Sequence, residues 1–206
     1  MLIEDPVRLA TAASLVLAYS GLCAYSWNRA RLARSSVPGS GPRHASHEAR
    51  RVRPILVAFA SQTGFAEALA QETAQTLALS GLAVRIAPLG SATLIDLSEC
   101  AQLVVIASTC RKGDAPDNAQ QFVDTVMRRR AELDRLPFLL LALGDRRYRD
   151  FCAFGRRVDD WLQASGAIPV FNRIELDGDD PVALSEWRDH LPGISAQARQ
   201  QTRFPL

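Results

Sequence analysis

The chain has 206 residues, of which 48% are hydrophobic and 22% are charged. This length suits one ordinary domain with an appendage, and the balanced charge argues against wholesale disorder. The charge is uneven: residues 1–53 carry eight arginines against three acids, whereas residues 54–206 are slightly acidic. The basic excess therefore belongs to the N-terminal segment, and the slightly acidic body does not fit a nucleic-acid-binding domain.

The cysteines are scattered and form no CxxC pair. This spacing indicates neither a zinc site nor a secreted disulfide framework, and it fits a reducing compartment. The three histidines add no ligand pattern, so we expect no metal. The four cysteines are Cys23, Cys100, Cys110 and Cys152.

The stretch Leu9–Trp27 contains no charged residue and is about as long, as a helix, as the hydrocarbon core of a bilayer is thick. Arg29, Arg31 and Arg34 follow it at once, so the positive-inside rule places the rest of the chain in the cytoplasm. We predict a single-pass anchor in the inner (cytoplasmic) membrane. There are two alternatives. One is a cleavable signal peptide, which normally begins with a basic segment; the other is an amphipathic or buried helix.

Residues 35–53 have the Ser, Pro, Gly and Arg composition of a solvated linker, which places a domain boundary near Arg53. The predicted organisation is an N-terminal tail (1–8), a transmembrane helix (9–27), a basic flexible linker (28–53), a globular domain (54–191) and a C-terminal tail (192–206).

Apolar runs and helical periodicities alternate through the globular domain. They predict an α/β fold: a doubly wound, five-stranded parallel sheet with helices on both faces. In such sheets the ligand lies beyond the carboxyl ends of the strands, which draws attention to the loops after the first, third and fourth strands. The predicted strands are Ile55–Ala60, Leu82–Pro88, Leu103–Ser108, Phe138–Leu143 and Ala167–Leu176. The predicted helices are Ala66–Ser80, Asn118–Arg130, Phe154–Ser165 and Val182–Leu191.

The loop after the first strand, SQTGFAE (61–67), runs directly into a helix. The hydroxyls of Ser61 and Thr63, together with Gly64 and free amides at a helix N-terminus, suit a phosphate dianion. The loop is neither a Walker A motif nor GxGxxG. An ordinary Ser or Thr helix cap is the alternative interpretation.

Three further motifs follow at the expected places: STCRKGDAPDNA (108–119), LGDRRYRDFCAFG (143–155) and GDD (178–180), the last followed by Trp187. Taken with SQTGFAE, their order resembles the flavodoxin-like FMN domain of diflavin reductases. Relatives of this pattern are the flavoprotein of sulfite reductase, the cytochrome reductases and the reductase domain of nitric oxide synthase. The resemblance spans residues 54–191.

The resemblance implies FMN as the cofactor, with its phosphate in the first loop and its ring between the second and third loops. It implies that Tyr148 stacks on one face of the ring, while Cys152 is also open to a pure packing role. The implied cofactor-binding residues are Ser61, Gln62, Thr63, Gly64, Phe65, Ala66, Ser108, Thr109, Cys110, Arg111, Leu143, Gly144, Asp145, Arg146, Arg147, Tyr148, Arg149, Asp150, Phe151, Cys152 and Asp179.

The second loop departs from the family pattern Thr-Tyr-Gly-Glu-Gly-Asp. Cys110 replaces the aromatic ring, Arg111 replaces a glycine whose peptide can turn toward the reduced flavin, and Lys112 replaces an acid. With Arg146, Arg147 and Arg149, these loops carry five cations. We expect the cations either to raise the reduction potential of the flavin or to form a docking surface for an acidic partner.

The predicted function is that of a membrane-anchored, FMN-binding electron-transfer flavoprotein, an oxidoreductase component. The resemblance covers only the FMN half of the diflavin reductases, so electrons would come from a separate NAD(P)H-linked FAD reductase and pass to a haem or ferric acceptor. Two alternatives stay open: a flavodoxin-like scaffold without FMN, supported by the altered residues 110–112, and a stand-alone FMN-dependent quinone reductase.

Overall fold

The computed structural model describes residues 53–110 and 112–203, with side chains as far as Ile194. The predicted membrane helix Leu9–Trp27 lies outside these residues. Within the described part of the chain, no helix is both long enough and apolar enough to cross a bilayer. The folded body starts where expected: the guanidinium of Arg53 donates to the carbonyl oxygens of Ser98 and Cys100 at 2.6 and 2.7 Å, just before β1 (Ile55–Ala60) begins.

The sheet is parallel and has the strand order β2-β1-β3-β4-β5, with β6 also paired to β4. Its strands are β1, β2 (Val84–Pro88), β3 (Gln102–Ser108), β4 (Pro137–Gly144), β5 (Ile168–Pro169) and β6 (Ile174–Asp177). All six residues of β1 are buried, as its continuous apolar run predicts for a central strand covered on both faces. The flavodoxin-like parallel architecture expected from the sequence is confirmed.

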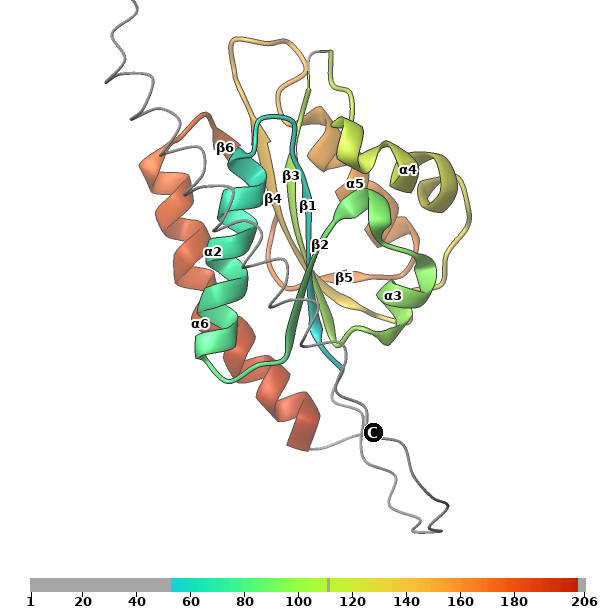
Figure 1. Cartoon of the computed structure of the whole chain (residues 1–206), viewed down its shortest axis with the longest axis vertical. Coiled ribbons are helices and arrows are strands. Elements are labelled where there is room, and N and C mark those ends of the chain that lie inside the picture. The colour runs from blue at the N-terminus through green and yellow to red at the C-terminus, as the bar shows by residue number, and fades with distance from the viewer. Residues whose placement is uncertain (1–52, 111, 204–206) are drawn as a thin grey trace, which may run out of the picture. The chain divides into compact units, whose positions relative to one another are not determined.

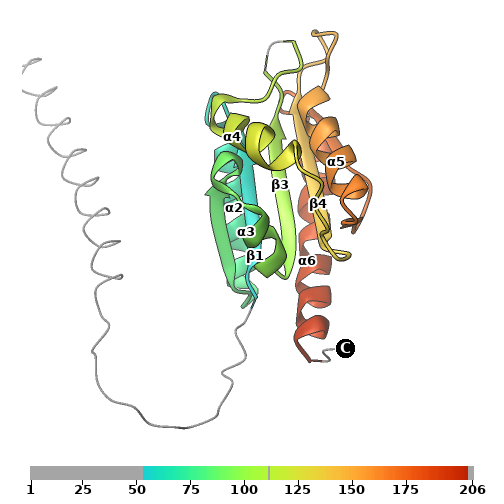
Figure 2. The ribbon, with the colours of Figure 1, turned by 90° about the vertical axis from the view of Figure 1, so that its right-hand side faces the viewer.

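Helices cover both faces of this sheet (Figure 1). The helices α2 (Phe65–Leu79) and α6 (Pro181–Arg203) lie on one face, where the indole N–H of buried Trp187 donates to Thr73 Oγ1 at 3.1 Å. The other face carries α3 (Leu94–Glu99), α4 (Gln120–Phe122) and α5 (Ala153–Ala164), which lie in front of the sheet in Figure 2, with α6 behind it. Two apolar cores result, one on each face of the sheet.

The predicted fifth strand is wrong as a continuous strand, because the structure divides it into β5 and β6. Phe138 pairs with Pro169 and Leu141 with Ile174, so three steps along β4 correspond to five along its neighbour. The two extra residues bulge out of the ladder. They let Phe171 leave the sheet and stack on His190 of α6, with ring centroids 3.9 Å apart.

The helices differ from the sequence prediction in three places. The helix predicted over Asn118–Arg130 is a 3-10 turn (Asp117–Ala119), then α4, then a π-helical turn (Val123–Met127). Helix α3 was not predicted, although Thr93 and Asp96 form a full capping box at its start. Helix α6 runs through Pro192 to Arg203 instead of ending at Leu191, because buried Leu191 and Ile194 continue its apolar face.

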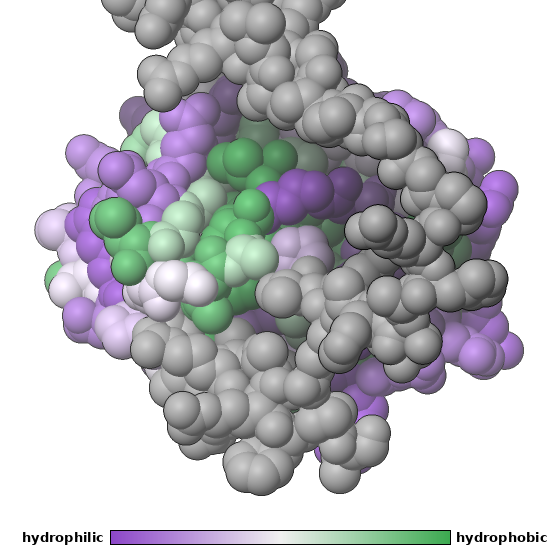
Figure 3. All heavy atoms as spheres, turned by 60° about the horizontal axis from the view of Figure 1, so that its bottom comes forward, coloured by the Kyte–Doolittle hydropathy of each residue, from purple (hydrophilic) through white to green (hydrophobic). Residues whose placement is uncertain are grey.

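The two ends of the sheet differ in their surroundings. The chain enters β1 at the lower end in Figure 1, and the loops after β1, β3 and β4 lie at the upper end. Seen toward the lower end, the described surface shows a hydrophobic area flanked by hydrophilic side chains (Figure 3). The upper end is the one where an open parallel sheet binds its ligand.

Candidate functional site

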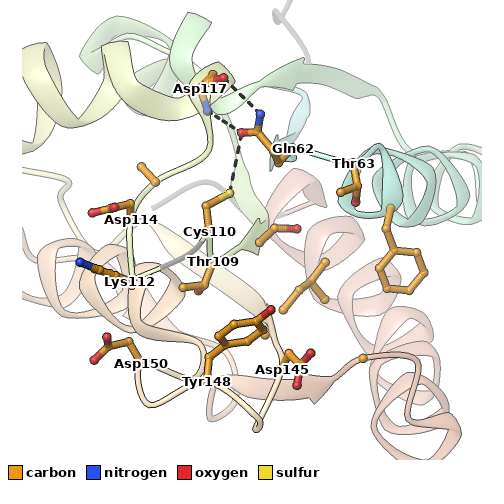
Figure 4. A pocket seen from close by; sticks show the side chains of 16 residues that line it. Gln62, Thr63, Thr109, Cys110, Lys112, Asp114, Asp117, Asp145, Tyr148 and Asp150 are labelled. Carbon is orange, nitrogen blue, oxygen red and sulfur yellow. Dashed lines mark hydrogen bonds between the residues drawn. The ribbon is translucent and has the colours of Figure 1, made fainter.

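A cavity of about 840 Å³ opens at the carboxyl ends of β1, β3 and β4. The three loops singled out in the sequence all contribute to it, joined by Gly178 from the turn after β6 (Figure 4). The lining residues are Gln62, Thr63, Phe65, Ser108, Thr109, Cys110, Lys112, Asp114, Ala115, Asp117, Leu143, Gly144, Asp145, Tyr148, Asp150 and Gly178.

The loop after β1 has the geometry of an anion cradle. Gly64 adopts a left-handed backbone (φ 91°), and its N–H donates to Ser61 Oγ at 3.0 Å. Ser61 thus closes the turn and does not cap the first helical amides. Among the described residues, the N–H groups of Phe65 and Ala66 find no acceptor. Ala66 is fully buried, whereas Phe65 is exposed and lines the cavity at the start of a 15-residue helix. The free amide of Phe65, beside the Thr63 hydroxyl, fits the phosphate of a flavin mononucleotide.

The loop after β3 is a tight hairpin. Cys110 and Asp114 exchange two backbone hydrogen bonds of 2.9 Å, and Gly113 takes a positive φ of 85°. A β-carbon on Gly113 would stand 3.2 Å from Asp150 Cβ, so this hairpin rests on the loop after β4. Arg111 lies outside the described residues. Lys112 is exposed and lines the cavity.

The loop after β4 presents Tyr148 to the cavity with 60% of its surface exposed. Its N–H donates to the carbonyl oxygen of Asp145 at 3.0 Å, which closes the turn that carries the ring. An open, flat aromatic side chain at this place suits stacking on a planar ring. Phe65, 39% exposed, is the second aromatic residue of the lining.

Two of the cations predicted to surround the ring, Arg146 and Arg147, contact neighbouring side chains of the same loop. Arg147 donates to both carboxylate oxygens of Asp145, and this hydrogen bonding holds the pKa of Asp145 below its ordinary value. The guanidinium of Arg146 lies 4.9 Å from the centre of the Phe151 ring. Of the five cations, Lys112 alone lines the cavity among the described residues, against four aspartates. Acidic side chains therefore outnumber basic ones in the described lining of the cavity.

Cys152 is a packing residue in this structure. It is fully buried with φ 53°, and its thiol donates to the carbonyl oxygen of Ala142 at 3.2 Å. Burial raises the pKa of this thiol to about 12, which removes it from thiolate chemistry. Gly144 packs against it so closely that an added β-carbon would stand 2.9 Å from Cys152 Sγ.

Of the 21 predicted cofactor-binding residues, Arg111 lies outside the described residues and the other 20 fall into two sets. Eleven line the cavity: Gln62, Thr63, Phe65, Ser108, Thr109, Cys110, Leu143, Gly144, Asp145, Tyr148 and Asp150. Nine lie outside the lining: Ser61, Gly64, Ala66, Arg146, Arg147, Arg149, Phe151, Cys152 and Asp179. The prediction omitted Lys112, Asp114, Ala115, Asp117 and Gly178, although all five lie within the quoted motifs.

An open parallel sheet with a mononucleotide-sized cavity at its strand ends defines a flavodoxin-like domain. The comparisons with known proteins agree: residues 57–189 match the model of the family described as "Flavodoxin". The chain belongs to the flavodoxin family. The fold, the match and the flavoprotein relatives identify FMN as the cofactor, as expected from the sequence.

The most similar curated relatives include two bacterial proteins named "Sulfite reductase [NADPH] flavoprotein alpha-component". The one from Aliivibrio fischeri is 33% identical over 135 residues, and the one from Bacillus subtilis is 35% identical over 136 residues. These matches cover 65% and 66% of this chain but only 22% of either relative. Among solved structures, a mutant flavodoxin from Pseudomonas aeruginosa is 25% identical with a TM-score of 0.62, over 71% of this chain and 99% of that one.

Proposed function

We propose that this protein is an FMN-dependent electron carrier, anchored in the inner membrane by Leu9–Trp27, with its flavodoxin-like domain in the cytoplasm. The observation that supports it best is the convergence of three loops on one cavity, with the free amide of Phe65 on one side and the open ring of Tyr148 on another. Bound FMN supplies one- and two-electron redox chemistry. The chain has to hold the cofactor, shield it and present it to partners.

Each loop has a distinct task in this proposal. The amide of Phe65 and the hydroxyl of Thr63 bind the phosphate. Tyr148 covers one face of the ring and excludes water from it. The Cys110–Asp114 hairpin lines the cavity on the side where the family pattern places an aromatic ring.

The electron donor in this proposal is a separate NAD(P)H-linked FAD reductase, and the acceptor is a haem or ferric centre. Support comes from the similarity to sulfite reductase flavoproteins, whose name includes NADPH.

The test is the visible spectrum of the purified full chain, followed by anaerobic reduction. We expect flavin absorption bands, or their appearance on FMN addition. We also expect NADPH to reduce the flavin only after ferredoxin–NADP⁺ reductase is added. Protein that takes up no FMN would establish the scaffold alternative, and rapid reduction by NADPH alone would establish the quinone reductase.

The anchor is tested separately by extraction and proteolysis. Full-length protein should stay in the membrane fraction through an alkaline carbonate wash. Protease added to intact cells should spare the domain, and opening the inner membrane should expose residues 35–53. Release without detergent would refute the anchor and leave the FMN proposal standing.

A further inference from the structure

The side chain of Gln62 joins two of the three loops that form the cavity. Its amide nitrogen donates to Asp117 Oδ2 at 3.1 Å, and its amide oxygen accepts from the Asp117 N–H at 3.3 Å. The same oxygen contacts Cys110 Sγ at 3.8 Å. Figure 4 shows these three contacts extending from Gln62 toward the segment after β3.

The segment that receives Gln62 is firmly held. The N–H of Ser61 donates to Asn118 Oδ1 at 2.9 Å, next to the Gln62 contacts. Gly90 packs against the backbone of Asn118 from the other side. A β-carbon added to Gly90 would stand 2.4 Å from the carbonyl oxygen of Asn118, so no space is left between the two segments. Asp117 is therefore a fixed point to which a flexible side chain can be tied.

Cys110 opens the short hairpin that lines the cavity, and Lys112 within this hairpin is exposed. Its far side rests on Asp150 through Gly113. The contact of Cys110 with Gln62 holds its near side against the phosphate loop. A change at Gln62 should consequently move the hairpin without touching the cradle amides.

We propose that Gln62 is a positioning residue that holds the Cys110–Asp114 hairpin beside the flavin ring by bridging to Asp117, and that its side chain does not bind the phosphate. This proposal rests on the proposed binding of FMN. It separates two roles within one loop: Thr63 acts on the phosphate, and Gln62 acts on the ring side of the cavity.

The first test compares FMN with riboflavin, which lacks the phosphate, by fluorescence titration of the full chain. In Gln62→Leu the dissociation constants of both flavins should rise by the same factor, about tenfold for two lost hydrogen bonds. In Thr63→Ala the constant for FMN should rise and that for riboflavin should not. Gln71→Leu, an exposed change on α2 outside the cavity lining, is the matched control.

The second test exchanges the amide of residue 62 and the carboxylate of residue 117. Gln62→Glu places two carboxylates face to face and should weaken both flavins further than Gln62→Leu. Adding Asp117→Asn supplies an amide donor to the new carboxylate and should restore the affinity to within about threefold of wild type. The flavin midpoint potential should shift in Gln62→Leu and return in the double variant, a pattern that general destabilisation does not produce.

The third test needs no flavin and so stands even if FMN binding fails. Without FMN, alkylation of Cys110, followed by mass spectrometry of its peptide, should be at least about threefold faster in Gln62→Leu than in wild type or Gln71→Leu. The proposal is overturned if only FMN, and not riboflavin, loses affinity. It is overturned equally if alkylation is unchanged, or if the double variant gives no rescue.

Discussion

The hydroxyl of Thr109, in the loop after β3, accepts the backbone N–H of Phe154 at 3.2 Å and so caps the first turn of α5. The helix has no cap of its own, because the residue before it, Cys152, is buried in a left-handed conformation and makes no side-chain cap bond. A residue of one cavity loop thereby fixes the helix that follows another cavity loop.

Thr109→Val should destabilise the domain by about 1 kcal/mol, because it removes the cap and leaves a helical amide without a partner. Thr109→Ser keeps the hydroxyl and should stay close to wild type. The midpoint of urea unfolding measures both. Equal stability of the valine and serine variants would contradict the capping role.

Thr63→Ala should weaken FMN binding by at least about tenfold, since a hydrogen bond to a charged group contributes roughly 1.5–3 kcal/mol. The stability of the apo domain should change little, because Thr63 is exposed and no hydrogen bond of its hydroxyl to another described residue is present. Fluorescence titration gives the affinity, and an unchanged value would place the phosphate elsewhere.

Gly144→Ala should be among the most damaging single changes in the domain. Its β-carbon would stand 2.7 Å from the backbone nitrogen of Cys152 and 2.9 Å from its sulfur, both in fixed structure. We expect a loss of at least about 2 kcal/mol or failure to fold. Gly193→Ala, with nothing within 4 Å in α6, is the control and should be neutral or stabilising by a few tenths of a kcal/mol.

Lys112→Glu should lower the midpoint potential of the bound flavin, because a negative charge at the cavity disfavours the more negative reduced form. The exposed site limits the effect to a fraction of a kcal/mol, and added salt should shrink it. Arg129→Glu makes the same charge change on an exposed residue outside the lining. Potentiometric titration should show a smaller shift for this control, and identical shifts would show that Lys112 does not act locally.

Glu175 of β6 should make stability depend on acid. Arg156 donates to both of its oxygens at 2.7 and 2.8 Å, and this hydrogen bonding, with help from Arg173, lowers the pKa of Glu175 below 4.5. A lowered pKa in the folded state means that the stabilisation is complete above about pH 4.5 and is lost as the pH falls toward the folded pKa.

The comparison that isolates this effect is Glu175→Gln against wild type, with Glu186→Gln as an exposed control. Urea midpoints measured from pH 7 down to pH 3 should fall less steeply for Glu175→Gln. The urea midpoints of wild type and Glu186→Gln should follow the same curve against pH. Parallel curves for all three proteins would remove Glu175 as a source of acid sensitivity.

The sheet and the position of the cavity could be predicted because they depend on local signals. The run Ile55–Ala60 is typical of a strand buried on both faces, and parallel strands bring their following loops to one edge. What could not be predicted depends on contacts far apart in sequence. The break between β5 and β6 follows from the packing of Phe171 on His190, and the continuation of α6 follows from burial of Ile194.

The same distinction applies within the site. Tyr148 and Thr63 line the cavity because their loops follow strand ends, a relationship that the sequence pattern indicates. The bond from Arg147 to Asp145 could not be predicted, because a sequence does not show that this side chain bends back onto the residue two positions earlier. The position of Asp117 in the cavity lining could not be predicted, because it depends on a contact with Gln62, which is 55 residues away in the sequence.

The close packing of Gly144 against Cys152 also bears on how such motifs are interpreted. Gly155 is constrained in the same way, since an added β-carbon would stand 2.4 Å from Ala142 Cβ. A descendant of this protein that had abandoned its flavin would still need these residues in order to fold, so selection for stability alone would preserve much of the 143–155 motif. The presence of this motif therefore indicates common ancestry. Thr63 and Tyr148 are exposed and are not required for folding, so their retention indicates that a protein still binds the cofactor.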